Sequence, residues 1–177
     1  MIDEFKKWMI EIQEVALATK REKAKAKGDE SKWKNEIWKS PEKNKAIKTR
    51  FQMEGDKRNY KSRPSAKTKA GEWLYDFVWR QFDDQGNLLG VKLTMEIEVS
   101  DMNEQGIKYD FNKLLQADSE YKILVFQLKS ESEVRTALKN FEQAAAVYRS
   151  KIRADYLLCG WSTSQNRFIF ADFCINV

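Results

Sequence analysis

The sequence contains no histidine, and this absence narrows the chemistry open to the chain. Catalytic triads with a histidine base, zinc-protease motifs and zinc sites built from His and Cys are excluded, because each of them needs an imidazole. Acid–base or metal-binding work must therefore fall to Asp, Glu, Lys, Tyr or Cys. Carboxylate oxygens remain available for hard divalent cations such as Mg²⁺.

Cysteine and long apolar runs are also scarce. Cys159 and Cys174 are the only cysteines, and both lie in apolar, strand-like segments, so we expect reduced core residues rather than a disulfide. No apolar run approaches the roughly 20 residues of a membrane-spanning helix. The first residues lack the basic and then apolar order of a secretory signal. These features predict a cytoplasmic protein without membrane contact.

Charge is distributed unevenly along the chain. Residues 1–70 contain 20 Lys and Arg against 11 Asp and Glu, whereas residues 71–177 contain 12 against 16. A basic segment joined to a mildly acidic one suggests an arm that contacts the phosphates of DNA, although lysine-rich helices can also simply be solvated. The candidate nucleic-acid-binding residues are Lys20, Arg21, Lys23, Lys25, Lys27, Lys57, Arg58, Lys61 and Arg63.

The spacing of apolar residues predicts helices in the first part of the chain and a sheet in the second. A helical stripe covers about residues 2–20, and a second helical segment carries Trp33, Ile37 and Trp38. Next come strands at 73–82 and 91–99, a helix at 109–117, a strand at 121–128, a helix at 131–151, and strands at 155–161 and 167–171.

We therefore predict an α/β fold, with a mixed central β-sheet flanked by helices. Strands 73–82 and 91–99 form a hairpin, and the β–helix–β crossover is expected to be parallel and right-handed. The predicted organisation is a basic helical N-terminal region with a linker at residues 1–67 and an α/β core at residues 68–177.

Carboxylates make the predicted hairpin the most informative segment. On its second strand, apolar residues alternate with polar ones that include Lys92, Glu96 and Glu98, so both glutamates point to the same face. Neighbouring carboxylates repel each other, and such a pair is tolerated where it faces solvent or where a cation lies between them. With Asp76 on the preceding strand, the pair is a candidate site for a divalent metal. Alternatively, Asp76 is an ordinary strand-end residue and the glutamates face solvent.

The order of elements and these acidic residues resemble the PD-(D/E)XK nuclease superfamily, whose fold is called restriction-endonuclease-like. Its pattern is an acid on one strand and then an acid, any residue and a lysine on the next. Asp76 matches the first acid, and Glu96-Ile97-Glu98 matches the second element with glutamate in place of lysine, as in some restriction endonucleases. Lys113, on the following helix, is similar to the lysine that takes over this role in a subset. The resemblance covers about residues 68–175.

The resemblance implies a Mg²⁺-dependent nuclease that cleaves DNA, with Mn²⁺ as a substitute metal, and a homodimer. Asp76, Glu96 and Glu98 would be the catalytic and metal-binding carboxylates, with the carbonyl of Ile97 as a further ligand, and Lys113 would lie near the attacking water. Lys113 could also be an exposed helix residue, and Asp110 a helix N-cap.

Two other functions stay open. Glutamate at position 98 and the lack of a proline before Asp76 favour a nucleic-acid-binding or regulatory protein that keeps the fold without catalysis. Aromatic-rich strands and the predicted helix at 131–151 favour an interaction module that dimerises. The nuclease hypothesis requires Asp76, Glu96 and Glu98 to converge within metal-bridging distance.

Overall fold

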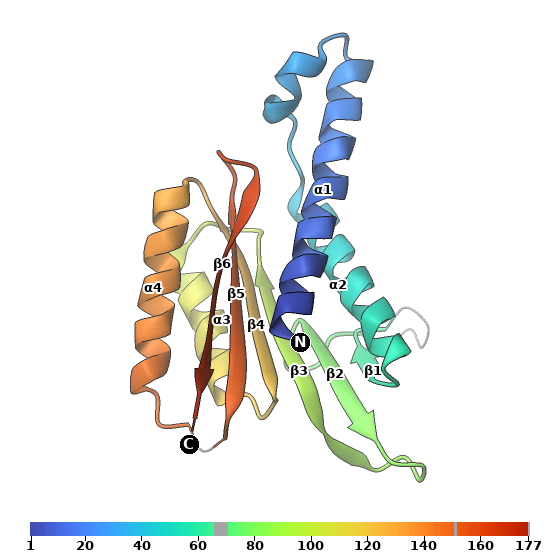
Figure 1. Ribbon diagram of the computed structural model, residues 1–177, viewed down its shortest axis with the longest axis vertical. Coiled ribbons are helices and arrows are strands. Elements are labelled where there is room, and N and C mark those ends of the chain that lie inside the picture. The colour runs from blue at the N-terminus through green and yellow to red at the C-terminus, as the bar shows by residue number, and fades with distance from the viewer. Residues whose placement is uncertain (66–70, 151, 177) are drawn as a thin grey trace.

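The computed structural model describes residues 1–65, 71–150 and 152–176, and it places helices on both faces of one β-sheet (Figure 1). In chain order the elements are α1 (Ile2–Ala26), the 3-10 helix η1 (Glu30–Asn35), α2 (Ser40–Lys57), β1 (Lys61–Arg63), β2 (Phe77–Phe82), β3 (Leu88–Glu98), α3 (Glu104–Gln116), β4 (Tyr121–Leu128), α4 (Glu131–Val147), β5 (Ala154–Ser162) and β6 (Arg167–Ile175). The predicted boundary between residues 67 and 68 lies outside the described residues.

The sheet has six strands, which lie side by side in the order of the sequence. Pairing is antiparallel from β1 to β3, parallel from β3 through β4 to β5, and antiparallel again between β5 and β6. α3 and α4 provide the crossovers that parallel pairing requires. The predicted hairpin, the parallel crossover and the α/β class with a mixed, helix-flanked sheet are confirmed.

Local sequence signals fix the ends of several elements. In the turn between β2 and β3, Asp83 Oδ1 accepts hydrogen bonds from the backbone nitrogens of Gln85 and Asn87, at 3.0 and 2.7 Å. Gly86 in this turn has a φ of +85°, which glycine adopts without steric cost. α4 begins with a capping box formed by Ser130 and Glu133. These signals determine where strands begin, and so which residues share a face.

α1 and α2 cover one face of the sheet. The ring of Phe5 in α1 lies 5.6 Å from that of Phe51 in α2, 5.8 Å from Trp79 in β2 and 5.4 Å from Tyr121 in β4, measured between ring centres. The predicted N-terminal region therefore shares one hydrophobic cluster with the sheet. β1, which also belongs to that region, pairs with β2 at the edge of the sheet.

α3 and α4 cover the opposite face, where Phe111 and Phe141 pack with their ring centres 4.8 Å apart. The tryptophans of the strands lie in the interior, since Trp79 and Trp161 are 0% and 2% exposed. Trp79 and Trp161 are therefore core residues, and the interaction-module hypothesis stays a prediction. The homodimer itself stays a prediction.

Three local predictions are wrong. Trp33 lies in a short 3-10 helix, η1, which ends at Asn35, and Trp38 lies in the extended connection to α2. The first hairpin strand begins at Phe77 instead of residue 73, because Leu74 has a φ of +64°, which interrupts the extended conformation. Cys174 is exposed, whereas Cys159 is buried as predicted.

In the part of the chain that the structure describes, no helix combines the length and the apolar character that a membrane crossing requires.

Candidate active site

Glu96 lies on β3 and is buried beneath α3. The predicted alternation of β3 holds, since Leu93, Met95 and Ile97 belong to the cluster covered by α1 and α2, and Glu96 points the other way. Only 1% of Glu96 is exposed, whereas Glu98 at the end of the strand is half-buried. The alternative of a solvent-facing strand is therefore wrong for Glu96.

Asp76 lies immediately before β2, next to Glu96. Extending the antiparallel register, in which Phe77 pairs with Met95, places Asp76 opposite Glu96. Asp76 Oδ2 accepts a hydrogen bond of 2.8 Å from the backbone nitrogen of Ile97, and Oδ1 lies 3.9 Å from Lys48 Nζ of α2. The backbone of β3 thus holds this carboxylate beside Glu96.

Lys113 reaches from α3 toward the same carboxylates. Its Nζ lies 2.7 Å from Glu96 Oε1 and 3.5 Å from Oδ1 of Asp110, one helical turn earlier. It also lies 5.9 Å from the ring centre of Tyr75. Lys113 is therefore engaged with the acidic residues. The alternative of Asp110 as N-cap is wrong, because the N-cap of α3 is Asn103.

The acidic side chains alter one another's protonation. Burial, together with the charges of Asp76 and Asp110, raises the pKa of Glu96 to about 8, although Lys113 acts in the opposite direction. Burial also raises the pKa of Asp110, and the charges of Asp76 and Glu98 add to this effect. For Lys113, burial lowers the pKa, but contact with Glu96 and the nearby carboxylates outweigh it and raise the pKa. Burial is therefore the main reason that Glu96 holds its proton, and the neighbouring carboxylates add to it.

The ammonium group of Lys113 compensates a buried oxygen of Glu96. Oε1 is buried and lies 2.7 Å from Lys113 Nζ. Buried polar atoms are nearly always satisfied by a partner. A metal ion at Oε1 would therefore share this oxygen with Lys113.

Glu98 does not join Asp76 and Glu96. Its Oε1 accepts hydrogen bonds from the backbone nitrogen of Ser100 at 3.1 Å, from Ser100 Oγ at 2.7 Å and from the backbone nitrogen of Asp101 at 3.2 Å. Within the described ranges, no three Asp, Glu or Cys side chains are arranged to hold a metal ion. The predicted convergence of three metal-binding carboxylates is therefore wrong, because Glu98 finds nearer donors in the turn that follows β3.

Asp76 and Glu96 remain as two adjacent carboxylates that fit a single hard cation. Mg²⁺ is usually held by one or two carboxylates, and water and substrate oxygens complete its octahedral shell. The backbone carbonyl of Ile97 is a further oxygen in the same segment.

Lys48 and Tyr75 border the site, and the sequence did not identify them. Lys48 Nζ lies 2.5 Å from Glu72 Oε1 and so brings a second positive charge close to Asp76. Burial, followed by the charge of Glu96, raises the pKa of Tyr75. Tyr75 could have been noticed as the neighbour of Asp76 in the sequence. The position of Lys48 follows from the packing of α2 on the sheet, which no local spacing reveals.

The candidate nucleic-acid-binding residues form two groups at opposite ends of α1. Arg58 pairs with Glu4 near the start of α1 at 2.7 Å, whereas Lys23 lies near its end. With a rise of 1.5 Å per residue, the two groups are about 30 Å apart. The first group also contains Lys57, Lys61 and Arg63, and the second contains Lys20, Arg21, Lys25 and Lys27. The basic arm is thus divided between two places.

Several of these basic residues already bind protein groups. Lys27 Nζ lies 2.6 Å from Glu36 Oε1, and Lys57 Nζ lies 2.8 Å from Glu54 Oε1. Lys20 is only 4% exposed and therefore does not contribute to the solvent-facing basic surface. Lys25 and Lys61 are exposed and are the clearest candidates for contact with DNA phosphates.

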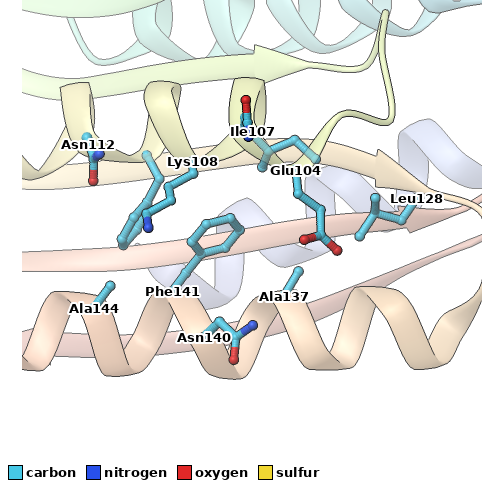
Figure 2. Close-up of a pocket in the computed structure, with 11 residues that line it drawn as sticks. Glu104, Ile107, Lys108, Asn112, Leu128, Ala137, Asn140, Phe141 and Ala144 are labelled. Atoms are coloured by element: carbon cyan, nitrogen blue, oxygen red, sulfur yellow. The ribbon is translucent and has the colours of Figure 1, made fainter.

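A cavity of about 290 Å³ lies between α3 and α4 (Figure 2). Figure 2 shows Lys108 and Asn112 of α3 facing the side of α4 that carries Asn140 and Phe141. Asp110 and Lys113 are not among its lining residues. α3 therefore turns one side toward the acidic residues and another toward this cavity.

The arrangement around Glu96 combines a buried carboxyl, an aspartate fixed by the backbone and a lysine in contact with the carboxyl. Perturbed carboxyl groups of this kind are typical of metal-ion and acid–base chemistry, although structural ion pairs also produce them.

Comparison of this chain with protein-family models, with curated proteins and with solved structures finds no match.

Proposed function

We propose that the chain is a Mg²⁺-dependent nuclease that hydrolyses phosphodiester bonds of DNA, with Mn²⁺ as a substitute metal. The observation that carries this proposal is the position of the buried Glu96 opposite Asp76 across the hairpin, where the pKa of Glu96 is raised to about 8. Burying one carboxyl next to another is unfavourable unless a cation compensates them. Two further features support a restriction-endonuclease-like fold. They are the position of the acids at the β2–β3 hairpin and the crossover that follows the hairpin.

Asp76 and Glu96 would hold the metal, together with the backbone carbonyl of Ile97. When bound, Mg²⁺ neutralises phosphate oxygens and favours hydroxide over water as the nucleophile. Lys113, whose raised pKa keeps it protonated at neutral pH, would offset the negative charge that develops on the phosphate. Asp110, 3.5 Å from Lys113, would keep that ammonium group in position.

Cleavage of mixed DNA substrates in Mg²⁺ or Mn²⁺ tests this function. We expect metal-dependent cleavage by the wild type. Glu96→Gln should lose more than about 100-fold of the activity, because a side chain that contacts the metal contributes more to its binding than the groups that only orient such a side chain. Glu120→Gln is the matched control, since Glu120 also pairs with a lysine, Lys92, but is exposed. Equal cleavage by the wild type and Glu96→Gln would contradict the assignment.

Metal binding without DNA provides an independent readout. Electron paramagnetic resonance of Mn²⁺ should detect binding to the wild type and to Glu120→Gln, and weak or absent binding to Asp76→Asn and Glu96→Gln. Unchanged Mn²⁺ binding in both ligand variants would place any metal elsewhere in the molecule.

A nucleic-acid-binding protein without catalysis is the second candidate, and the position of Glu98 favours it. Glu98 is occupied by the turn after β3, and Lys113 already neutralises Glu96 in part. This alternative predicts that DNA affinity is the same with Mg²⁺ and with a chelator. It also predicts that Glu96→Gln binds DNA as the wild type does and that neither protein cleaves it.

A further inference from the structure

A second cavity of about 290 Å³ lies where α1, η1 and α2 meet the carboxyl ends of β4 and β5. Lys20, Lys43, Gln127 and Asn166 supply polar side chains to its lining, and Glu36 supplies a carboxylate. Gln127 lies two residues after Val125 on β4 and points to the same face, and Val125 belongs to the cluster beneath α1 and α2. The cavity is therefore on the face of the sheet opposite to Glu96.

Lys20 and Lys43 are buried cations whose partners are uncharged. They are 4% and 3% exposed. Lys43 Nζ donates a hydrogen bond of 2.7 Å to Gln127 Oε1, and Lys20 Nζ donates one to Asn166 Oδ1. Neither lysine forms an ion pair with a carboxylate anywhere in residues 1–65, 71–150 and 152–176. Amide oxygens satisfy the hydrogen bonds but leave the two charges without a counter-charge.

Two acids act on these lysines, and each also pairs with another lysine. Glu36 lines the cavity, and its Oε1 lies 2.6 Å from Lys27 Nζ. Glu42 Oε1 lies 3.4 Å from Lys23 Nζ. Their charges raise the pKa of Lys20 and Lys43 respectively, but burial outweighs them. Glu36 therefore brings one negative charge, shared with Lys27, to a cavity that holds the two positive charges of Lys20 and Lys43.

The ammonium groups of Lys20 and Lys43 repel each other. Burial first, and then the charge of Lys20, lower the pKa of Lys43 to about 8. Burial also lowers the pKa of Lys20. An anion that contacts both groups would supply the missing counter-charge and remove their mutual repulsion.

The lining suits a tetrahedral dianion. The two lysines offer two positive charges, and the side-chain nitrogens of Gln127 and Asn166 are further donors, with no hydrogen bond to any residue that the structure describes. Lys43 Nζ lies 5.4 and 5.8 Å from the ring centres of Trp38 and Trp161, which exclude water and so strengthen charge interactions. A phosphate group matches several donors and two charges, whereas a carboxylate carries only one charge.

We propose that this cavity is a binding site for a phosphate group, with Lys20 and Lys43 as its counter-charges. Inorganic phosphate, a nucleotide and the terminal phosphate of a nucleic acid all present this chemistry. The site goes beyond the proposed nuclease activity and does not rest on it, because it lies on the other face of the sheet and needs no metal.

Calorimetric titration with inorganic phosphate, in a chelator and at constant ionic strength, tests the site. Lys43→Met removes the charge and keeps the apolar stem of the side chain. Lys122→Met is the matched control, because Lys122 is equally buried but donates to Leu115 O at 3.3 Å and to Tyr156 Oη at 3.1 Å, outside the cavity. We expect the wild type and Lys122→Met to bind phosphate and Lys43→Met to bind it about tenfold more weakly or worse. Absence of binding by the wild type, or equal binding by Lys43→Met, would overturn the proposal.

A negative charge introduced into the cavity by substitution tests the site in the opposite direction. Gln127→Glu keeps the shape of the side chain and places a carboxylate 2.7 Å from the position of Lys43 Nζ. This variant should melt at a higher temperature than the wild type and should no longer bind phosphate. It stays informative if Lys43→Met does not fold, and full phosphate affinity in Gln127→Glu would refute the site.

Sulfate and oligonucleotides complete the experiment. Sulfate does not titrate near neutral pH, so any proton taken up when it binds comes onto the protein. At about pH 8 we expect sulfate binding to add a proton to Lys43. The heats of binding in buffers of different ionisation enthalpy measure this uptake. Absence of this proton uptake would argue against Lys43 as the counter-charge.

Tighter binding of a 5′-phosphorylated strand than of its unphosphorylated form would identify a nucleic-acid end as the source. Equal binding of both strands, with phosphate binding retained, would identify a small molecule.

Discussion

Glu96 keeps a carboxyl group where an uncharged side chain would be more stable. Its pKa of about 8 in the folded protein lies above the ordinary value of 4.5, so over this interval the folded state holds a proton that the unfolded chain releases. The free energy of unfolding should therefore fall as pH rises through this window. We expect Glu96→Gln to lose much of this dependence and to exceed the wild type by about 1–3 kcal/mol above pH 8.

Urea denaturation at the two ends of this pH window measures the effect. Glu120→Gln, which removes an exposed carboxyl, should follow the wild-type profile. A Glu96→Gln protein less stable than the wild type at both pH values would show that the ion pair with Lys113 outweighs the cost of burial.

At the scale of single elements, two glycines in helices differ in the space available for a side chain. A Cβ atom at Gly55 in α2 would lie 2.4 Å from Trp79 Nε1, whereas one at Gly106 in α3 would meet nothing within 4 Å. We expect Gly55→Ala to destabilise the protein by about 1–3 kcal/mol, because α2 must move away from β2. Gly106→Ala should stabilise it by about 0.5–1 kcal/mol through helix propensity. Thermal unfolding of both variants checks the contrast, and a stabilising Gly55→Ala would disprove the close contact of α2 with β2.

Elements whose signals are local were predictable from the sequence. β3 was recognised from strict alternation and α4 from its apolar spacing, and both depend on neighbours within a few residues. The late start of β2 was not predictable, because it follows from the positive φ of Leu74, a residue type that rarely adopts such a conformation.

The candidate site was predictable only where strand register decides it. Asp76 and Glu96 are brought together by hairpin pairing, which the sequence implies. Glu98 was misassigned because its carboxylate accepts hydrogen bonds from the backbone nitrogens of the turn after β3. The spacing of residues in the sequence does not show the geometry of such a turn. Lys48 was missed because its position depends on how a separate helix packs on the sheet.

At the scale of the whole molecule, the candidate nucleic-acid-binding residues form two groups about 30 Å apart, a distance of about nine base pairs along a duplex. Lys25 and Lys61 are exposed members of these two groups. If one duplex contacts both, affinity should rise with length up to about ten base pairs. The double variant Lys25→Ala/Lys61→Ala should bind more weakly, with its logarithmic salt dependence reduced by about 2.

Fluorescence anisotropy at several salt concentrations measures this dependence. Lys108→Ala/Lys139→Ala, on α3 and α4, removes the same charge from the other face and should leave the slope unchanged. Equal losses in the two double variants would indicate a general effect of net charge instead of two defined contacts.

The contacts of α1 have a consequence for the order in which the chain acquires its structure. Each strand pairs with one already synthesised, so the sheet can grow on the ribosome without inserting a strand between two others. α1 is made first, yet Lys6 Nζ lies 2.5 Å from Asp172 Oδ1, and Gln13 Oε1 accepts a hydrogen bond of 2.7 Å from the backbone nitrogen of Phe168. Since both partners belong to β6, the earliest helix finishes docking only after the last strand has emerged.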